Sequence, residues 1–121
     1  DAGPVYVKAP LDLSGRADEI YARACAVAAG MIRTIIETHP VPTPQTGTPV
    51  VFRRRRPEES EIPANAGLDT VHDFIRMLDA DGYPHAFVRH GDLRLELRHA
   101  VREGDAIRAD VRIVRRSEGD E

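Results

Sequence analysis

Apolar residues recur at intervals of three and four from Ile20 to Ile36, and this spacing predicts a long amphipathic helix with His39 in its last turn. The stripe consists of Ile20, Ala24, Val27, Ala28, Met31, Ile32, Ile35 and Ile36. Ser14 precedes the stripe as a candidate N-cap. Pro40, Pro42 and Pro44 follow it, and they end the helix because proline has no backbone N–H to donate.

The second half of the chain predicts a short helix followed by three strands. A second stripe at helical spacing consists of Val71, Phe74, Ile75 and Leu78. From Ala86 to Val114 the period changes to two, so that apolar and charged residues alternate as in a sheet with one buried face. Gly91-Asp92 and Glu103-Gly104-Asp105 fall between the apolar runs as turns, which predicts an antiparallel meander.

Two short β-favouring runs lie in the first half of the chain. Val5-Tyr6-Val7 predicts a strand that ends near Leu13, and Val50-Val51-Phe52 predicts a second one. The proline-rich segment before the second run predicts an extended connection. Because a single strand beside a long helix cannot pair at both edges, we expect the first third of the chain to belong to a larger sheet.

The composition is that of a soluble globular chain with 121 residues, of which 41% are hydrophobic. The 17 basic and 20 acidic residues give a net charge of -3, without the basic excess of a general nucleic-acid binder. There is no apolar run of about 18 residues, so we expect no membrane partner. Cys25 lies in an Ala-rich helical stretch and is expected to pack as a small apolar residue in a cytoplasmic protein. The five histidines lack the spacing of a zinc site, so no metal is expected.

Residues 53–56 are four consecutive arginines, followed by Pro57-Glu58-Glu59. Two interpretations are open. A charge run of this kind is usually solvated and partly neutralised by neighbouring acids. Guanidinium groups also match phosphoryl oxygens well, so the run is a candidate phosphate clamp. The pattern alone favours the solvated run.

Three separated stretches resemble the formyltetrahydrofolate-dependent formyltransferases, a family that includes methionyl-tRNA formyltransferase and sugar-nucleotide N-formyltransferases. "DAGPVYVK" is similar to the Asp-Ala-Gly segment of the family, and "FRRRRPEESEI" to the linker that leaves its catalytic domain. "FIRMLDADGYPHAF", followed by "LRLEL", is similar to the start of the C-terminal subdomain. Gly82-Tyr83-Pro84 replaces the usual Pro-Trp-Pro or Pro-Tyr-Pro, so the acceptor substrate cannot be inherited from either subgroup.

The resemblance implies an α+β (mixed α/β) chain with two parts. Residues 1–62 would be the tail of a Rossmann-like catalytic domain, with a strand, the long helix and the Arg-rich linker. Residues 63–121 would be a C-terminal α+β subdomain, in which a small helix and an antiparallel meander resemble the OB-like subdomain of the family. The family's Asn and His precede the Asp-Ala-Gly segment and are not in this sequence. We therefore expect the C-terminal part of a longer formyltransferase, inactive by itself.

The resemblance assigns Asp1 to the family's catalytic aspartate. In the implied reaction a primary amine attacks the formyl carbon of 10-formyltetrahydrofolate, a cofactor bound mainly by the N-terminal part. The Asn and a protonated His stabilise the resulting oxyanion. The carboxylate orients the His, raises its pKa, and accepts or relays a proton from the amine.

Four further residues are candidates for binding the acceptor. Arg54 and Arg55 lie in the linker beside the path of the acceptor and suit its phosphates. Arg76 is expected to reach either a phosphate or Asp79. Tyr83 offers a ring that stacks on a nucleotide base or packs within the subdomain.

The near-neutral charge favours an amino-sugar nucleotide as the acceptor over methionyl-tRNA, because phosphate attraction supplies most of the affinity for RNA. An alternative from another class is a stand-alone, non-catalytic ligand-binding or interaction module that holds an anionic partner with Arg53–Arg56. Unpaired sheet edges also make a homodimer an expected form, since edge strands pair readily with another chain.

Overall fold

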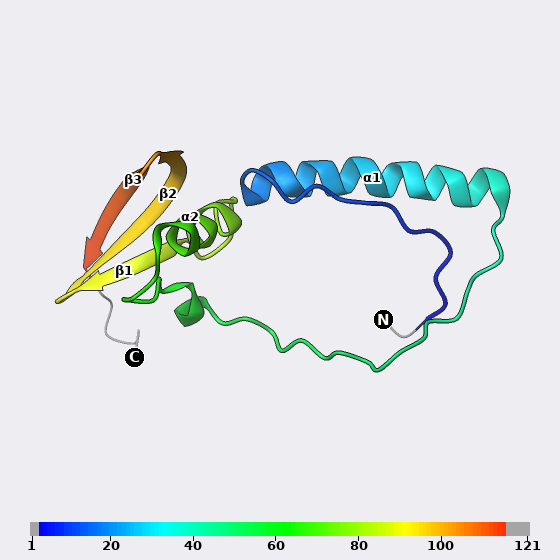
Figure 1. Ribbon diagram of the computed structural model, residues 1–121, viewed down its shortest axis with the longest axis horizontal. Helices are drawn as coiled ribbons and strands as arrows, with labels where there is room; N and C mark the ends of the chain where they lie inside the picture. The colour runs from blue at the N-terminus through cyan, green and yellow to red at the C-terminus, as the bar shows by residue number, and fades with distance from the viewer. Residues whose placement is uncertain (1–2, 116–121) are drawn as a thin grey trace. The chain divides into compact units, whose positions relative to one another are not determined.

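The computed structural model describes residues 3–115, which divide into two compact units. Residues 3–14 and 19–53 belong to the first unit, and residues 15–18 and 54–115 to the second. The elements follow in the order α1, η1, α2, β1, β2 and β3 (Figure 1). Each unit is described by itself below.

The predicted long helix is confirmed as α1, which spans Ala17–Thr38. It ends as expected: His39 adopts a positive φ of 46° and is followed by Pro40, while the His39 N–H donates to the Ile35 carbonyl at 3.0 Å. Ser14, however, does not cap the helix. Its N–H and hydroxyl donate to the carboxylate of Asp12 at 3.0 and 2.7 Å, so the pKa of Asp12 is lowered, chiefly by the Ser14 hydroxyl.

The apolar stripe of α1 is only partly covered. Ala17 is the buried residue of this helix, whereas Ile32 is 58% and Ile36 65% exposed. Met31 and Ile35 are half-buried. The periodicity therefore predicted the helix correctly, but within the described residues its apolar face is only partly covered.

The predicted strand from Val5 to near Leu13 is wrong. Val5 instead forms an isolated antiparallel bridge with Thr43, in which the two residues exchange N–H to carbonyl hydrogen bonds of 2.8 and 2.9 Å. The bridge stays isolated in the described residues. Pro42 and Pro44 on either side of Thr43 have no N–H, so they offer no donors to a further strand on the other side of this segment.

The second predicted strand, residues 50–52, is also wrong. This segment lies outside the strands of the described residues, and its side chains are 74–91% exposed. The β preference of Val and Phe expresses packing against neighbouring strands. Without such a neighbour the segment stays irregular.

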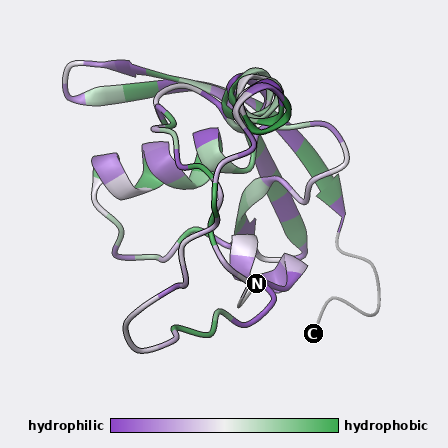
Figure 2. Ribbon diagram, turned by 90° about the vertical axis from the view of Figure 1, so that its right-hand side faces the viewer, coloured by the Kyte–Doolittle hydropathy of each residue, from purple (hydrophilic) through white to green (hydrophobic). Residues whose placement is uncertain are grey.

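The second unit confirms the predicted helix and meander. Its elements are the 3-10 helix η1 (Pro57–Ser60), the helix α2 (Leu68–Met77), and the strands β1 (Ala86–His90), β2 (Leu93–Glu103) and β3 (Ala106–Arg115). The strands pair antiparallel in the order β1-β2-β3, and apolar and hydrophilic residues alternate along them (Figure 2). Both hairpins close with two-residue turns, in which Gly91 and Gly104 have φ values of 56° and 59°, as such turns require.

The core of this unit lies between α2 and one face of the sheet. Ile62, Ile75, Leu78 and Ala86 form its buried cluster. Partly buried residues of the sheet, among them Val88 and Leu97, pack against it. The linker after η1 joins the sheet through the Ile62 N–H, which donates to the Phe87 carbonyl at 2.8 Å. Helix, linker and sheet thus share one apolar interior.

A bulge interrupts β2 between Arg98 and Val101, where the register against β3 shifts. At its centre His99 has a φ of 51°. Leu97 before the bulge and Ala100 within it both pack against the core, although three positions separate them. The extra residue therefore changes which positions of β2 face inward.

Asp79, in the turn after α2, binds this bulge. Its side chain is 2% exposed, and its carboxylate accepts hydrogen bonds from the His99 N–H at 2.7 Å and from the Arg98 Nε at 3.1 Å. Burial is the largest single influence and raises the pKa of Asp79, but the hydrogen bonds from His99 and Arg98 outweigh it and the pKa is lowered. The buried group is therefore a carboxylate at neutral pH.

Replacing Asp79 with Asn should destabilise the second unit at neutral pH. The change removes the charge that both donors require, and hydrogen bonds to a charged group contribute about 1.5–3 kcal/mol. A carboxyl whose pKa is lowered by folding adds stability above its unfolded pKa of about 3.9, and this stability is lost as the pH falls through the folded pKa. In urea unfolding followed by circular dichroism, Asp79→Asn should therefore be less stable at about pH 7, and the difference should shrink below about pH 4.

Asp92→Asn is the matched control, because Asp92 lies in an exposed hairpin turn and its replacement should change the unfolding free energy by less than about 0.5 kcal/mol. An Asp79→Asn chain as stable as the wild type at neutral pH would contradict the role assigned to the carboxylate.

Candidate functional site

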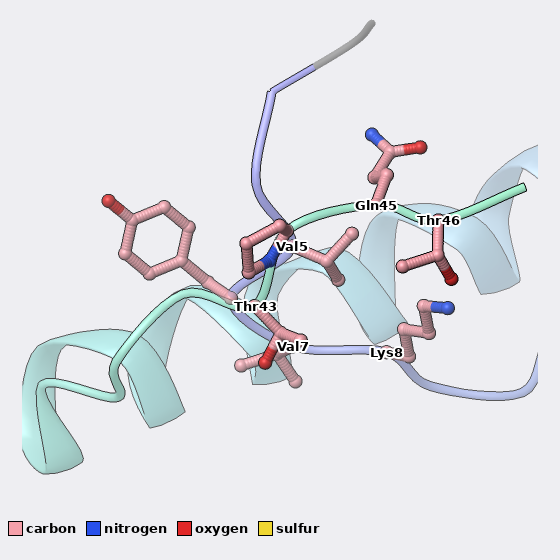
Figure 3. A pocket seen from close by; sticks show the side chains of 8 residues that line it. Val5, Val7, Lys8, Thr43, Gln45 and Thr46 are labelled. Atoms are coloured by element: carbon pink, nitrogen blue, oxygen red, sulfur yellow. The ribbon is translucent and has the colours of Figure 1, made fainter.

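Asp1, the predicted catalytic aspartate, lies outside the described residues. The segment that follows it lines one side of a cleft of about 450 Å³ in the first unit (Figure 3). Val5, Val7 and Lys8 come from this segment. The other side is lined by Thr43, Gln45 and Thr46, which follow α1 in the chain.

A side-chain hydrogen bond joins the two sides of this cleft. The Gln45 Nε2 donates to the backbone carbonyl of Gly3 at 2.7 Å, beside the reciprocal backbone pair between Val5 and Thr43. The segment after Asp1 is thus held at both Gly3 and Val5. Gln45 was not among the residues predicted from the sequence; its signal is a long amide side chain within an otherwise proline-rich connection.

A second cleft of about 640 Å³ is lined by residues 45–52. Neither cleft is lined by Arg54, Arg55, Arg76 or Tyr83. The four residues predicted to bind the acceptor all lie in the second unit, where different partners hold them.

Arg55 is fixed against α2. Its Nη2 donates to the Glu59 carbonyl at 2.6 Å, and its guanidinium carbon lies 5.4 Å from the centre of the Phe74 ring, within cation–π range. The Glu59 carboxylate in turn accepts from the Arg56 N–H at 2.7 Å. Arg54 is exposed. Of the two predicted phosphate ligands, Arg54 therefore presents the more accessible guanidinium group.

Arg76 forms an ion pair with a residue three positions away on the helix, but its partner is Asp73 and not the predicted Asp79. The Arg76 Nε lies 2.7 Å from the Asp73 Oδ1, and the Arg76 Nη1 donates to the Gly15 carbonyl at 3.0 Å. Asp79 is bound by Arg98 and His99 instead. Arg76 thus ties the segment before α1 to α2.

Tyr83 lies in the loop between α2 and β1 and is 46% exposed. Gly82 before it has a φ of 78°, and the Tyr83 N–H donates to the Ala80 carbonyl at 3.2 Å. Phe87 nearby in the sequence is 2% exposed, and Arg94 covers its ring at 4.0 Å. Tyr83 therefore keeps about half of its surface available to a partner.

The face of the sheet opposite α2 carries several guanidinium groups that the sequence analysis assigned to no function. By strand alternation and register this face includes Arg89, Arg94 and Arg112. Glu96 lies among them, 3.4 Å from the Arg94 Nε and 3.3 Å from the Arg112 Nη1. The alternation of the sequence predicted a charged face. It could not predict that Arg94 packs over the Phe87 ring, because this contact depends on how β1 pairs with β2.

Within residues 3–115, no group of three or more His, Cys, Asp or Glu side chains is arranged to hold a metal ion. No helix in this range is long and apolar enough to cross a bilayer.

Comparisons with known proteins point to one family. Residues 57–114 match a family model described as methionyl-tRNA formyltransferase, C-terminal domain. Among solved structures, a methionyl-tRNA formyltransferase from Clostridium thermocellum is similar, with 43% sequence identity and a TM-score of 0.91. The match covers 95% of this chain and 51% of that one, so the chain spans about half the length of that structure. None of the curated proteins matches the chain.

Arg55→Ala should destabilise the second unit, whereas Arg54→Ala should not. Arg55 has a ring contact and a carbonyl partner, and an exposed cation–π contact contributes about 0.5–1 kcal/mol. Arg54 is exposed, and such surface replacements usually stay within about 0.5 kcal/mol. Urea unfolding of the two variants measures the difference, and equal effects would contradict the structural role of Arg55.

Proposed function

Because the chain belongs to the formyltransferase family and corresponds to its C-terminal part, we propose that the full-length protein transfers a formyl group from 10-formyltetrahydrofolate to a primary amine. The observation that carries this proposal is 43% identity to a methionyl-tRNA formyltransferase over 95% of the chain. In this reaction the amine nitrogen bonds to the formyl carbon, tetrahydrofolate leaves, and the amine gives up a proton.

Residues 1–62 would complete a Rossmann-like catalytic domain, and residues 63–121 would form the C-terminal subdomain. The exposed apolar stripe of α1 supports this division, since Ile32 and Ile36 are more than half exposed and burial of such a side chain contributes about 1.5–3 kcal/mol. The second unit has its own buried cluster between α2 and the sheet. Residues 1–62 would thus need strands from the N-terminal half of the protein to cover the apolar stripe of α1. Residues 63–121 would not, because they have a core of their own.

Asp1 would act in the complete catalytic domain. Its carboxylate would orient the histidine that the family resemblance implies, favour its protonated form, and accept or relay the proton that leaves the amine. The Asn and His of that constellation are not in this sequence. The chain alone should therefore be inactive.

For the acceptor, the similarity to a methionyl-tRNA formyltransferase supports the amine of methionyl-tRNA. The sequence analysis favoured an amino-sugar nucleotide because the net charge is -3; on the strength of this similarity we propose methionyl-tRNA instead. The net charge of a chain is a poor guide to its acceptor when the charges are unevenly placed, because a local cluster of charges creates its own electrostatic potential. The arginines on the polar face of the sheet and the exposed Arg54 are consistent with a phosphate-rich acceptor.

The full-length protein should form formylmethionyl-tRNA when given 10-formyltetrahydrofolate and methionyl-tRNA. Asp1→Asn should slow the transfer by about a hundredfold to ten-thousandfold, the usual contribution of a general acid or base. Formation of formylated product, separated from substrate by chromatography after deacylation, measures the rate. Asp105→Asn, in an exposed hairpin turn, is the matched control and should retain the wild-type rate.

Parallel reactions with amino-sugar nucleotides identify the acceptor. Transfer to the sugar amine alone would overturn the choice of methionyl-tRNA while leaving the formyltransferase activity in place. Transfer to neither acceptor would overturn the proposed function.

A further inference from the structure

The outer edge of β3 is open in the part of the chain that the structure describes. The strands lie in the order β1-β2-β3, so β2 pairs with one edge of β3 and no described strand pairs with the other (Figure 1). The β1 edge of the sheet is closed, because Glu61 forms a parallel bridge with Phe87 and the Ile62 N–H donates to the Phe87 carbonyl at 2.8 Å. A further strand can therefore pair with this sheet at β3.

β3 lacks two features that commonly keep an edge strand from pairing, namely proline and a bulge of its own. It runs from Ala106 to Arg115 without a proline, and the extra residue of the bulge lies in β2. Val111 is 50% and Ile113 61% exposed. By strand alternation they lie on the same face as Ile107 and Ala109, which pack against the core. A partner strand along this edge would extend the apolar face of the sheet.

The charges on the other face of β3 suit a second copy of the same strand. On this face Asp110 lies between Arg108 and Arg112. In an antiparallel pair with a two-fold axis at Val111, Asp110 of each copy lies directly opposite the partner's Arg112. Opposite charges across a strand pair stabilise it, and like charges destabilise it. An axis at Asp110 would instead place Asp110 against Asp110 and Arg108 against Arg112, so the charges disfavour that register.

The length of the ladder favours the axis at Val111 over another register that matches opposite charges. An axis at Ala109 would pair only residues 106–112 of β3, whereas the axis at Val111 pairs residues 107–115. Cross-strand side-chain pairs are the unit of sheet stabilisation. The longer ladder is therefore the more stable one.

Asp110 and Arg112 remain accessible to a partner strand. Within the chain the Asp110 Oδ2 lies 2.8 Å from the His99 Nδ1, and the Arg112 Nη1 lies 3.3 Å from the Glu96 Oε2. The Asp110 and Arg112 side chains are nevertheless 78% and 77% exposed. Each therefore has room for a second partner of opposite charge.

We propose that the protein forms a homodimer in which β3 pairs antiparallel with β3 of a second copy, about a two-fold axis at Val111. A two-fold interface uses the same surface of both subunits, so each favourable pair occurs twice. On the apolar face Val111 meets the partner's Val111, and Ile113 meets the partner's Ala109. The sequence predicted a homodimer from sheet edges in general, and the closed β1 edge together with the charges of β3 points to one strand and one register.

Cysteine cross-linking of the full-length protein tests the register. Directly opposed Cα atoms of an antiparallel pair lie about 4.5–5.5 Å apart, within the range of about 4.4–6.8 Å that a disulfide spans. Val111→Cys, in a protein in which serine replaces Cys25 and any cysteine of the N-terminal half, should therefore form a disulfide-linked dimer on oxidation with copper phenanthroline. A non-reducing gel measures the linked fraction.

Ile113→Cys is the matched control. Residue 113 lies on the same face of β3 and is more exposed than Val111, so a disulfide formed by random collision should link it at least as well. In the proposed register its two copies are four residues apart along the strands, or about 14 Å, which a disulfide cannot span. Ile113→Cys should therefore stay unlinked.

Sedimentation velocity of the full-length protein measures the contribution of the charges. Asp110→Arg places two arginines opposite each other at both symmetric pairs, so the dissociation constant of the dimer should rise by about tenfold to a hundredfold. Adding Arg112→Asp reverses both charges and should restore most of the affinity. Arg108→Asp reverses a charge on the same face, but residue 108 lies opposite the partner's Val114, so this control should leave the dissociation constant nearly unchanged.

A linked Val111→Cys dimer together with weaker association of Asp110→Arg supports the interface. A wild type that stays monomeric over the whole concentration range would overturn the homodimer. A dimer in which Val111→Cys does not cross-link, or in which Asp110→Arg associates as tightly as the wild type, would overturn the pairing at β3. None of these outcomes requires formyl transfer, so the interface and the proposed function stand or fall separately.

Discussion

The fold of the second unit depends on the pairing of one buried carboxylate with one bulge. Asp79 follows α2 and His99 lies in β2, and their hydrogen bond closes the helix onto the sheet. A buried charge is costly unless it is hydrogen-bonded, and a bulge leaves a residue without its ladder partner. The His99 N–H in the bulge gives the buried carboxylate a donor, and the carboxylate gives that N–H an acceptor. The Asp79 carbonyl also accepts the Asp18 N–H at 3.4 Å, so the same residue holds the first turn of α1.

The bulge also determines how the sheet presents its charges. Because it adds one residue to β2, inward-facing positions continue with Ala100 after Leu97. The opposite face keeps its guanidinium groups, of which Arg94 lies over the Phe87 ring and beside Glu96. These side chains are held by their neighbours. A chain with a net charge of -3 can therefore carry an ordered, arginine-rich surface.

The periodicity of the sequence predicted the elements whose partners lie nearby in the chain. α1, α2 and the meander were confirmed because helices and hairpins depend on local spacing and turns. The strands expected at Val5 and Val50 were wrong, since a strand requires a neighbour that no local pattern specifies. Asp79 with His99 and Gln45 with Gly3 join residues 20 and 42 positions apart. The alternation of β2 breaks at Arg98-His99-Ala100, where the bulge lies, but no local pattern specifies the carboxylate that binds it.

The two units are stabilised in different ways, and this difference bears on how the first one works. In the second unit the buried apolar cluster and the contacts of Asp79 are formed by residues of that unit. In the first, α1 leaves Ile32 and Ile36 more than half exposed and the rest of its apolar stripe only half-buried, and isolated helices depend largely on packing for their stability. The opening segment is held there by hydrogen bonds to a proline-stiffened connection, which a single side chain completes. The position of the opening segment from Gly3 to Val5 thus depends on a few directional contacts in a region with little core of its own, so loss of one such contact should loosen this segment and leave the second unit unchanged.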